Sequence, residues 1–145
     1  MCIKEGEQAW FVSVDIMTIN DAGNLFDASS LAAIAALKNT YFREFDPVTG
    51  IVDYKSVTKN KLPVAKEPLS ITVYKINGTL IVDPTVQEEQ AAQARLTITS
   101  DSKGIISAMQ KGGDTPLTAD EISKIVDIAL EKSAFLRKIL DEALN

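Results

Sequence analysis

The stretch SITVYKINGTLIVD, residues 70–83, constrains the fold more than any other part of the chain. Residues 70–76 and 79–83 are rich in β-branched side chains. Between them, Asn77-Gly78 is the dipeptide that best accommodates the positive φ angles of a two-residue turn. The sequence therefore predicts an antiparallel hairpin that stops at Pro84, because proline has no N–H to continue a ladder.

A second hairpin and a long helix are expected further along the chain. Residues 94–99 and 104–110 lie on either side of a polar turn and predict two more strands. Thr118 and Glu121 have the spacing of a capping box, in which each side chain bonds the backbone N–H of the other residue. The helix that follows runs to about Leu144 and carries an apolar stripe.

The first third of the chain predicts a strand, a turn and a helix. Residues 9–19 alternate in the manner of a strand, and the polar, glycine-containing residues 20–24 predict a turn. Asp27 or Ser29 can cap a helix that ends near Lys38. Because alanines and large apolar residues occupy most of this helix, we expect it to be buried nearly all round, against a sheet or another subunit.

The middle of the chain completes the predicted architecture. Two short strands, residues 41–45 and 51–57, are expected around a turn at 46–50, with a polar loop at 58–67. The order of elements predicts an α+β fold, a two-layer sandwich in which helices cover one face of a mainly antiparallel or mixed sheet. Since no repeat or flexible linker divides the chain, we predict a single domain over residues 1–145.

Composition excludes several kinds of chemistry. One cysteine and no histidine leave no disulfide framework, no thiolate metal cage and no histidine-based catalysis within this chain. We predict no cofactor and no metal site, since the acids Asp83, Glu88 and Glu89 have no evident further ligand. The net charge of −5 argues against nucleic-acid binding by bulk positive charge. The lone cysteine, the polar N-terminus and the absence of a long apolar run predict a cytoplasmic protein outside the membrane.

Several unrelated local patterns also recur in a specific order. They are W-x-V-x-V-D at 10–15, GN-x-x-DA-x-SLAA-x-AAL at 23–37, KLPV at 61–64, LIVDPT at 80–85 and QK-x-G at 110–113. Together they resemble RNase PH-like proteins, and most closely the non-catalytic RNase PH-type subunit of the archaeal exosome ring. The resemblance implies half of the RNase PH-like, ribosomal protein S5 domain 2-like fold, its C-terminal portion. Met1 would then be a native start or a truncation, and surface left uncovered would need a partner or self-association.

The resemblance also implies that the active-site groups are missing. In active members, the turn before the small-residue helix reads Gly-Thr-Arg-Ser-Ala-Ser and carries an Arg-Ser pair. The aligned positions here are Leu25 and Phe26. The two active-site aspartates of the family lie six residues apart before a Met-Pro, and they align with Asn60 and Lys66. An uncharged pair cannot replace a guanidinium clamp, so we predict no catalytic residue and treat these four positions as degenerate.

The function implied by the resemblance is that of a non-catalytic structural subunit in an exosome-type 3′–5′ RNA-degrading ring. A catalytic RNase PH-like partner in the hexameric ring would supply the phosphate, metal and carboxylate chemistry. RNA would be contacted through the complex, and Lys59, Lys61 and Lys66 are weak candidates for contacts, since a solvated loop explains these isolated lysines better. Two alternatives stay open: a divergent phosphorolytic exoribonuclease with shifted acids such as Glu67 and Asp53, and an association module that binds no RNA.

Overall fold

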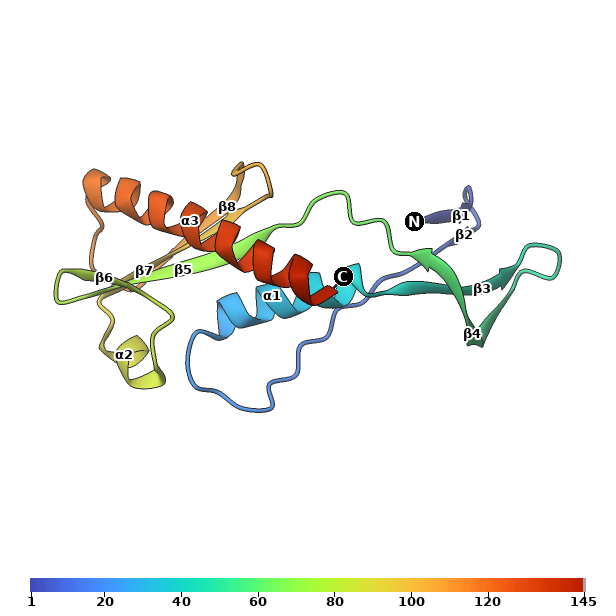
Figure 1. The fold of residues 1–145 in the computed structure, drawn as a ribbon, viewed down its shortest axis with the longest axis horizontal. Coiled ribbons are helices and arrows are strands. Elements are labelled where there is room, and N and C mark those ends of the chain that lie inside the picture. The colour runs from blue at the N-terminus through green and yellow to red at the C-terminus, as the bar shows by residue number, and fades with distance from the viewer. Residues whose placement is uncertain (145) are drawn as a thin grey trace.

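The computed structural model describes residues 1–144, and its central element is a four-stranded antiparallel sheet (Figure 1). The strands, in their order across the sheet, are β6 (Thr79–Val82), β5 (Leu69–Ile76), β7 (Ala94–Ser100) and β8 (Ile106–Gly112). Both predicted hairpins are confirmed. In the first, Ile76 pairs with Thr79, and Asn77 and Gly78 have φ angles of 48° and 80°. These are the positive values that the dipeptide favours.

Three boundaries in the predicted strands are wrong by two residues or more, and one of them is the end expected at residue 110, which lies at Gly112. The strand expected from residue 104 begins at Ile106, because the Asp101 carboxylate accepts from the N–H groups of Lys103 and Ile105, at 2.9 Å each, and holds them in the turn. The strand expected to end at residue 57 continues to Lys61, since it stays paired with the strand before it. The first part of the expected loop at 58–67 is therefore strand.

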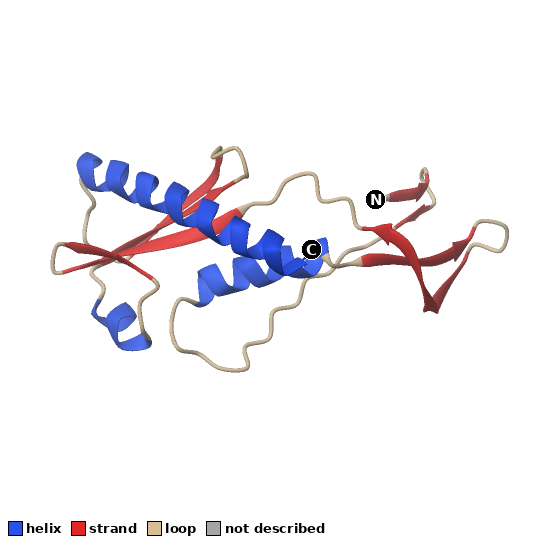
Figure 2. Cartoon of the chain, viewed as in Figure 1, coloured by secondary structure: helices blue, strands red, loops and turns tan. Residues whose placement is uncertain are grey.

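Helix α3 (Ala119–Leu144) covers one face of the sheet and forms the main core with it (Figure 2). The buried residues of this core are Ile71, Val73, Leu96, Ile98, Ile125 and Ala129. The predicted capping box starts the helix: Thr118 N donates to the Glu121 carboxylate at 2.9 Å, and Glu121 N donates to Thr118 Oγ1 at 3.2 Å. The α+β sandwich is thus confirmed.

Helix α1 (Leu25–Lys38) packs beside α3 and against the first residues of β5. Ile34, Leu69 and Leu140 form a second buried cluster where the three elements meet. The predicted caps are wrong, because the helix begins at Leu25 with Asn24 as its N-cap residue.

The alanine face of α1 also differs from expectation. Ala28, Ala32 and Ala36 are exposed, so the helix is not buried all round by the described residues. These alanines follow one another at a spacing of four residues and form a single small-residue stripe along the helix. Only the opposite side of the helix packs on β5 and α3.

Two further parts complete the fold. The strands β1 (Cys2–Lys4), β2 (Gln8–Ala9), β3 (Tyr41–Asp46) and β4 (Ile51–Lys61) form two two-stranded ladders. They make an arm that extends away from the main sheet (Figure 1). A short helix, α2 (Val86–Ala91), separates β6 from β7 and starts with a capping box of Thr85 and Glu88 that the sequence analysis did not identify.

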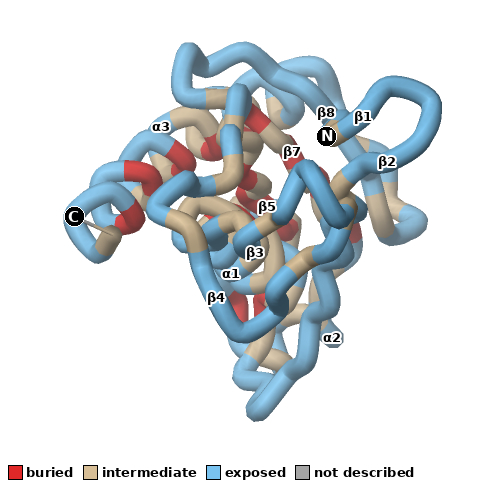
Figure 3. Tube along the Cα trace, turned by 90° about the vertical axis from the view of Figure 1, so that its right-hand side faces the viewer, coloured by how far each residue is buried: buried red, intermediate tan, exposed pale blue. Residues whose placement is uncertain are grey.

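The strand predicted over residues 9–19 is wrong. Ala9 ends β2, whereas residues 10–19 belong to no strand, and all of them except the half-buried Trp10 lie exposed along the surface (Figure 3). Phe11, Met17 and Ile19 are 89–98% exposed. An alternating sequence forms a strand only when a neighbouring strand satisfies its backbone, and the described residues supply none here. We call residues 10–19 the extended segment. Within residues 1–144, no helix is both long enough and apolar enough to cross a membrane.

Candidate functional site

Gly23 fixes the turn that leads into α1. Its φ angle is 110°, and a Cβ atom at this position would lie 2.2 Å from the carbonyl oxygen of Pro84. Its N–H donates to the carboxylate of Asp21 at 2.9 Å. Only glycine fits this conformation and this close approach, so the turn is held tightly against the connection between β6 and α2.

Asn24 connects the start of α1 to two carboxylates. It is buried in a left-handed conformation with φ 56°. Its N–H donates to Glu89 Oε1 at 3.0 Å, and its Nδ2 donates to Asp83 Oδ1 at 3.1 Å. The same Glu89 oxygen accepts from the Tyr74 hydroxyl at 2.6 Å. Burial, together with this bond to Glu89, raises the pKa of Tyr74.

Asp27 attaches α1 to the edge of the sheet. Its carboxylate is buried and accepts from Thr72 N and Thr72 Oγ1, both at 2.8 Å. Burial raises the pKa of Asp27, and the two bonds from Thr72 oppose that rise. Since β6 pairs only with Val73–Ile76, the N–H of Thr72 lies on a free part of the β5 edge. Asp27 therefore takes the place of a neighbouring strand, as does Ser30, whose hydroxyl accepts from Ser70 N at 3.0 Å.

Acidic side chains give the start of α1 a negative local charge. Asp27, Asp83 and Glu89 lie around Asn24, where the helix dipole favours negative charge. A phosphate at a helix N-terminus needs free N–H donors and positive side chains. The three carboxylates repel an incoming anion, and the N–H of Asn24 is already used.

Phe26 lies over the face of the sheet opposite α3. The residue is 52% exposed and shares a hollow with Thr97 and Thr99. The guanidinium carbon of Arg95 lies 4.7 Å from the ring centroid. The sequence analysis missed Arg95, although its alternation with Thr97 and Thr99 places it on the open face. A cation therefore lies near the degenerate position, but it contacts an aromatic ring.

The other degenerate positions lie elsewhere. The hollow beside Phe26 includes neither Asn60 nor Lys66. Asn60 is exposed on β4, in the arm, and lines a different hollow. Lys66 precedes β5 and helps to lower the pKa of Asp101, a shift caused mainly by the N–H of Ile105.

The candidate RNA-contacting lysines are divided between two parts of the chain. Lys59 and Lys61 are exposed on β4, whereas Lys66 lies in the connection to β5. Lys61 Nζ is 5.5 Å from the centroid of the Tyr41 ring, in a cation–π contact. The three lysines therefore lie in two separate parts of the chain, and their RNA contacts stay a prediction.

The acids considered for a divergent enzyme also occupy different places. Glu67 pairs with Lys38 at 3.0 Å, between α1 and α3. Asp53 lies in the arm and accepts from Ser56 Oγ at 2.6 Å, a bond that lowers its pKa. These acids form no catalytic pair. Among the residues described, no three acidic, cysteine or histidine side chains are placed to hold a metal ion.

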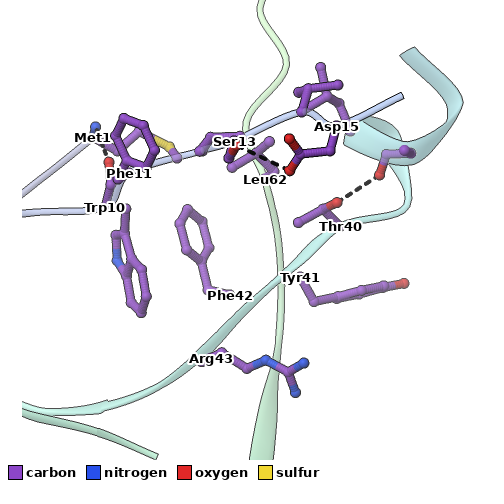
Figure 4. Close-up of a pocket in the computed structure, with 14 residues that line it drawn as sticks. Met1, Trp10, Phe11, Ser13, Asp15, Thr40, Tyr41, Phe42, Arg43 and Leu62 are labelled. Carbon is purple, nitrogen blue, oxygen red and sulfur yellow. Dashed lines mark hydrogen bonds between the residues drawn. The ribbon is translucent and has the colours of Figure 1, made fainter. Parts of the chain in front are cut away.

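A hollow of about 380 Å³ lies between the extended segment, the end of α1 and β3 (Figure 4). Trp10 and Phe42 line it with their ring centroids 5.7 Å apart at an interplanar angle of 48°. Trp10 thus packs against Phe42 of the arm, outside the two buried clusters. The other apolar side chains of the extended segment stay exposed, and an exposed apolar patch of this kind is typical of contact surfaces.

Comparison with protein families identifies two matching regions. Residues 66–132 match the family described as 3′ exoribonuclease family, domain 2, and residues 1–42 match domain 1 of the same family. The exosome complex component Rrp42 of Methanosarcina acetivorans is 41% identical over 146 aligned residues, which cover 99% of this chain and 52% of that protein. The Rrp42 of Methanothermobacter thermautotrophicus is 39% identical and is covered to 54%. The chain therefore spans about half the length of the curated relatives it matches.

Solved structures agree with these matches. A chain of an archaeal exosome core superimposes with a TM-score of 0.71 at 33% identity, over 85% of this chain and 47% of that chain. A chain of the Archaeoglobus fulgidus exosome, solved with RNA bound to the active site, gives a TM-score of 0.68 at 34% identity, over 83% and 44%. Rice Rrp46, at 15% identity and a TM-score of 0.60, shares the fold.

Proposed function

The chain belongs to the 3′ exoribonuclease family, the family of RNase PH, and on this premise we propose that it is a non-catalytic subunit of an exosome-type ring that degrades RNA from the 3′ end. It shapes the active site and the RNA path of a catalytic RNase PH-like partner. Relatives named as exosome component Rrp42 and the neighbouring exosome cores support this assignment. Residues 1–145 act as one RNase PH-like fragment within the ring.

The observation that carries the proposal is the composition of the entry to α1. A phosphorolytic site needs groups that hold inorganic phosphate while it attacks the terminal linkage. Here Asp27, Asp83 and Glu89 surround Asn24, and Leu25 and Phe26 supply no donor side chain. The chain therefore leaves the phosphate, metal and carboxylate chemistry to its partner.

The rest of the molecule suits an assembled state. The extended segment presents exposed apolar side chains, and the alanine stripe of α1 permits close approach of another element. A partner that covers these surfaces removes apolar area from water, at about 25 cal/mol per Å². RNA is contacted through the complex, with Lys59 and Lys61 of the arm and Lys66 before β5 as weak candidates for contacts. We place the protein in the cytoplasm, since its one cysteine, Cys2, is free and exposed.

Co-expression with a catalytic RNase PH-like homologue tests this function. The mixture is separated by size, and each fraction is assayed for phosphate-dependent release of nucleoside diphosphate from poly(A). We expect the chain to enter a ring-sized complex, to have no activity alone and to raise the activity of the partner. Replacing a catalytic carboxylate of the partner abolishes turnover, whereas Asn60→Ala, at a degenerate position of this chain, leaves it near the wild-type rate.

The alternatives have distinct outcomes. Nucleoside diphosphate release by the chain alone, lost in Glu67→Gln or Asp53→Asn, identifies a divergent enzyme and contradicts the proposal. Self-association without a partner and without activity identifies an association module and contradicts it equally.

A further inference from the structure

The ladder of β3 and β4 carries its charges in two separate halves. The half that adjoins the end of α1 consists of residues 41–43 and 57–61 (Figure 1). It contains no acid and three cations, which are Arg43, Lys59 and Lys61. Beyond the register shift, residues 44–56 contain three acids and one cation. We call these two parts the basic half and the acidic half of the ladder. On a chain with a net charge of −5, this separation gives the basic half a positive potential of its own.

Strand pairing brings the cations of the basic half next to an aromatic ring. Tyr41 is paired with Lys61, and Arg43 is paired with Val57. Residues directly opposite each other share a face of a ladder, and Tyr41 and Arg43 share a face because they lie two residues apart on β3. Lys59 is exposed in the bulge between the two pairs. The basic half therefore presents a tyrosine with cations on either side of it.

The ring of Tyr41 lies on the outer face of β3. Tyr41 is 37% exposed, and Figure 4 shows its side chain and that of Arg43 extending away from the Trp10 ring, whereas Phe42 extends toward that ring. Lys61 Nζ lies 5.5 Å from the centroid of the Tyr41 ring. Because the lysine stem is flexible, the ammonium group can move to a phosphate when a base stacks on the ring. Aromatic rings flanked by cations are the arrangement that binds single-stranded nucleic acid.

The cations of the basic half have no carboxylate partner. Within residues 1–144, Arg43, Lys59 and Lys61 form no ion pair, whereas five other lysines do. Asp53 lies across the register shift from Arg43, and its carboxylate accepts from Lys55 N and from Ser56 Oγ. An anion that binds the basic half therefore breaks no ion pair of the chain, and it gains the attraction of three cations.

We propose that the basic half of the ladder binds single-stranded RNA, with a base stacked on Tyr41 and the adjoining phosphates held by Arg43, Lys59 and Lys61. The inference rests on the proposed function, because the RNA reaches this surface within the ring. It adds Tyr41 and Arg43 to the two lysines and gives each side chain a role. An acidic polypeptide matches the charge equally but makes no use of the exposed ring, so RNA is favoured. Since stacking is tolerant of sequence, the surface guides RNA without selecting particular bases.

Fluorescence anisotropy of the ring complex tests this inference. The catalytic homologue in the complex carries a replaced active-site carboxylate, so that fluorescent oligo(A) is bound but not degraded. Tyr41→Ala should weaken binding about tenfold through the loss of one stacked base. Lys61→Gln should lower the slope of log affinity against log salt concentration by about 0.7, because one phosphate contact is lost. Tyr54→Ala and Lys55→Gln are the matched controls: they change exposed residues of the same types in the acidic half, and should leave binding unchanged.

An NMR titration of the labelled chain alone provides a measurement that needs no partner. With oligo(A) at low salt, where charges are least screened, the amides of residues 41–43 and 57–61 should shift saturably while those of residues 51–56 stay in place. Equal shifts in both halves, or no saturable shift, overturn the proposal. Unchanged affinity and salt slope in the Tyr41→Ala and Lys61→Gln complexes overturn it too. Displacement of the RNA by an equal concentration of polyglutamate identifies an acidic protein partner and also contradicts it. A chain that enters no ring contradicts the proposed function instead, and the titration then decides the RNA contact.

Discussion

The contact between α1 and the free edge of β5 makes a quantitative prediction. In Asp27→Ala, the buried N–H of Thr72 loses its acceptor, and the Thr72 hydroxyl loses one of its two partners. An unmade buried N–H costs about 1–3 kcal/mol and a lost neutral hydrogen bond about 1 kcal/mol, so the free energy of unfolding should fall by about 2–4 kcal/mol. Urea denaturation followed by circular dichroism measures this loss.

The matched control for this change is Asp46→Ala. Asp46 also accepts from one backbone N–H, that of Val48 at 2.8 Å, and from one hydroxyl, that of Thr49 at 2.7 Å. Because Asp46 is exposed, water replaces its carboxylate. We expect a much smaller loss in the control, and an equal loss in the two variants would refute the reasoning.

The stability difference between wild type and Asp27→Ala should also depend on pH, and the sign of this dependence follows from the pKa of Asp27. The pKa of folded Asp27 is raised above its ordinary value of 3.8, so the folded state binds this proton more tightly than the unfolded state. The stability that protonation provides is fully present below pH 3.8 and is lost as the pH rises through the folded pKa. The difference between wild type and Asp27→Ala should therefore grow as the pH is lowered from neutral. A difference that shrinks on acidification contradicts the account.

Three further predictions follow from single features. Gly23→Ala should lower the free energy of unfolding by about 2–4 kcal/mol, because the added Cβ overpacks the turn and strains its φ angle. Gly78→Ala, at φ 80° in open space, should lower it by only about 1–2 kcal/mol. The urea unfolding midpoints of the two variants measure this difference. Arg137→Met should cost about 2–4 kcal/mol, measured by thermal unfolding, because the buried guanidinium donates to two backbone carbonyls. Serine at Phe11 and Met17, which are about 90% exposed, should weaken entry of the chain into the complex with a catalytic homologue, measured by size-exclusion chromatography, without changing the melting temperature of the chain alone.

Local signals predicted the fold where the interactions are local. The turn at Asn77-Gly78 and the capping box of Thr118 and Glu121 involve residues close in sequence, and both form as expected. The start of α1 was predicted wrongly because the partner of Asp27 is Thr72, 45 residues away. A cap and an inward-facing ligand of a strand edge use the same residue types, so the sequence does not distinguish them.

The extended segment shows the limit of a periodicity argument. Its alternation was read correctly, but a strand also needs a neighbour, and none of the described residues provides one. At the candidate site, the side chains at Leu25 and Phe26 were readable from the sequence. The positions of the surrounding acids Asp83 and Glu89, and of the Arg95 cation, were not, since tertiary packing brings them from the residue after β6, from α2 and from β7.

A phosphate titration tests the central claim most directly. Inorganic phosphate, with and without Mg²⁺, is added to the isotopically labelled chain while the amide signals of residues 23–28 are followed. The account predicts no saturable shift at these residues, because carboxylates surround the helix entry. Saturable phosphate binding there, strengthened by Mg²⁺, would contradict it.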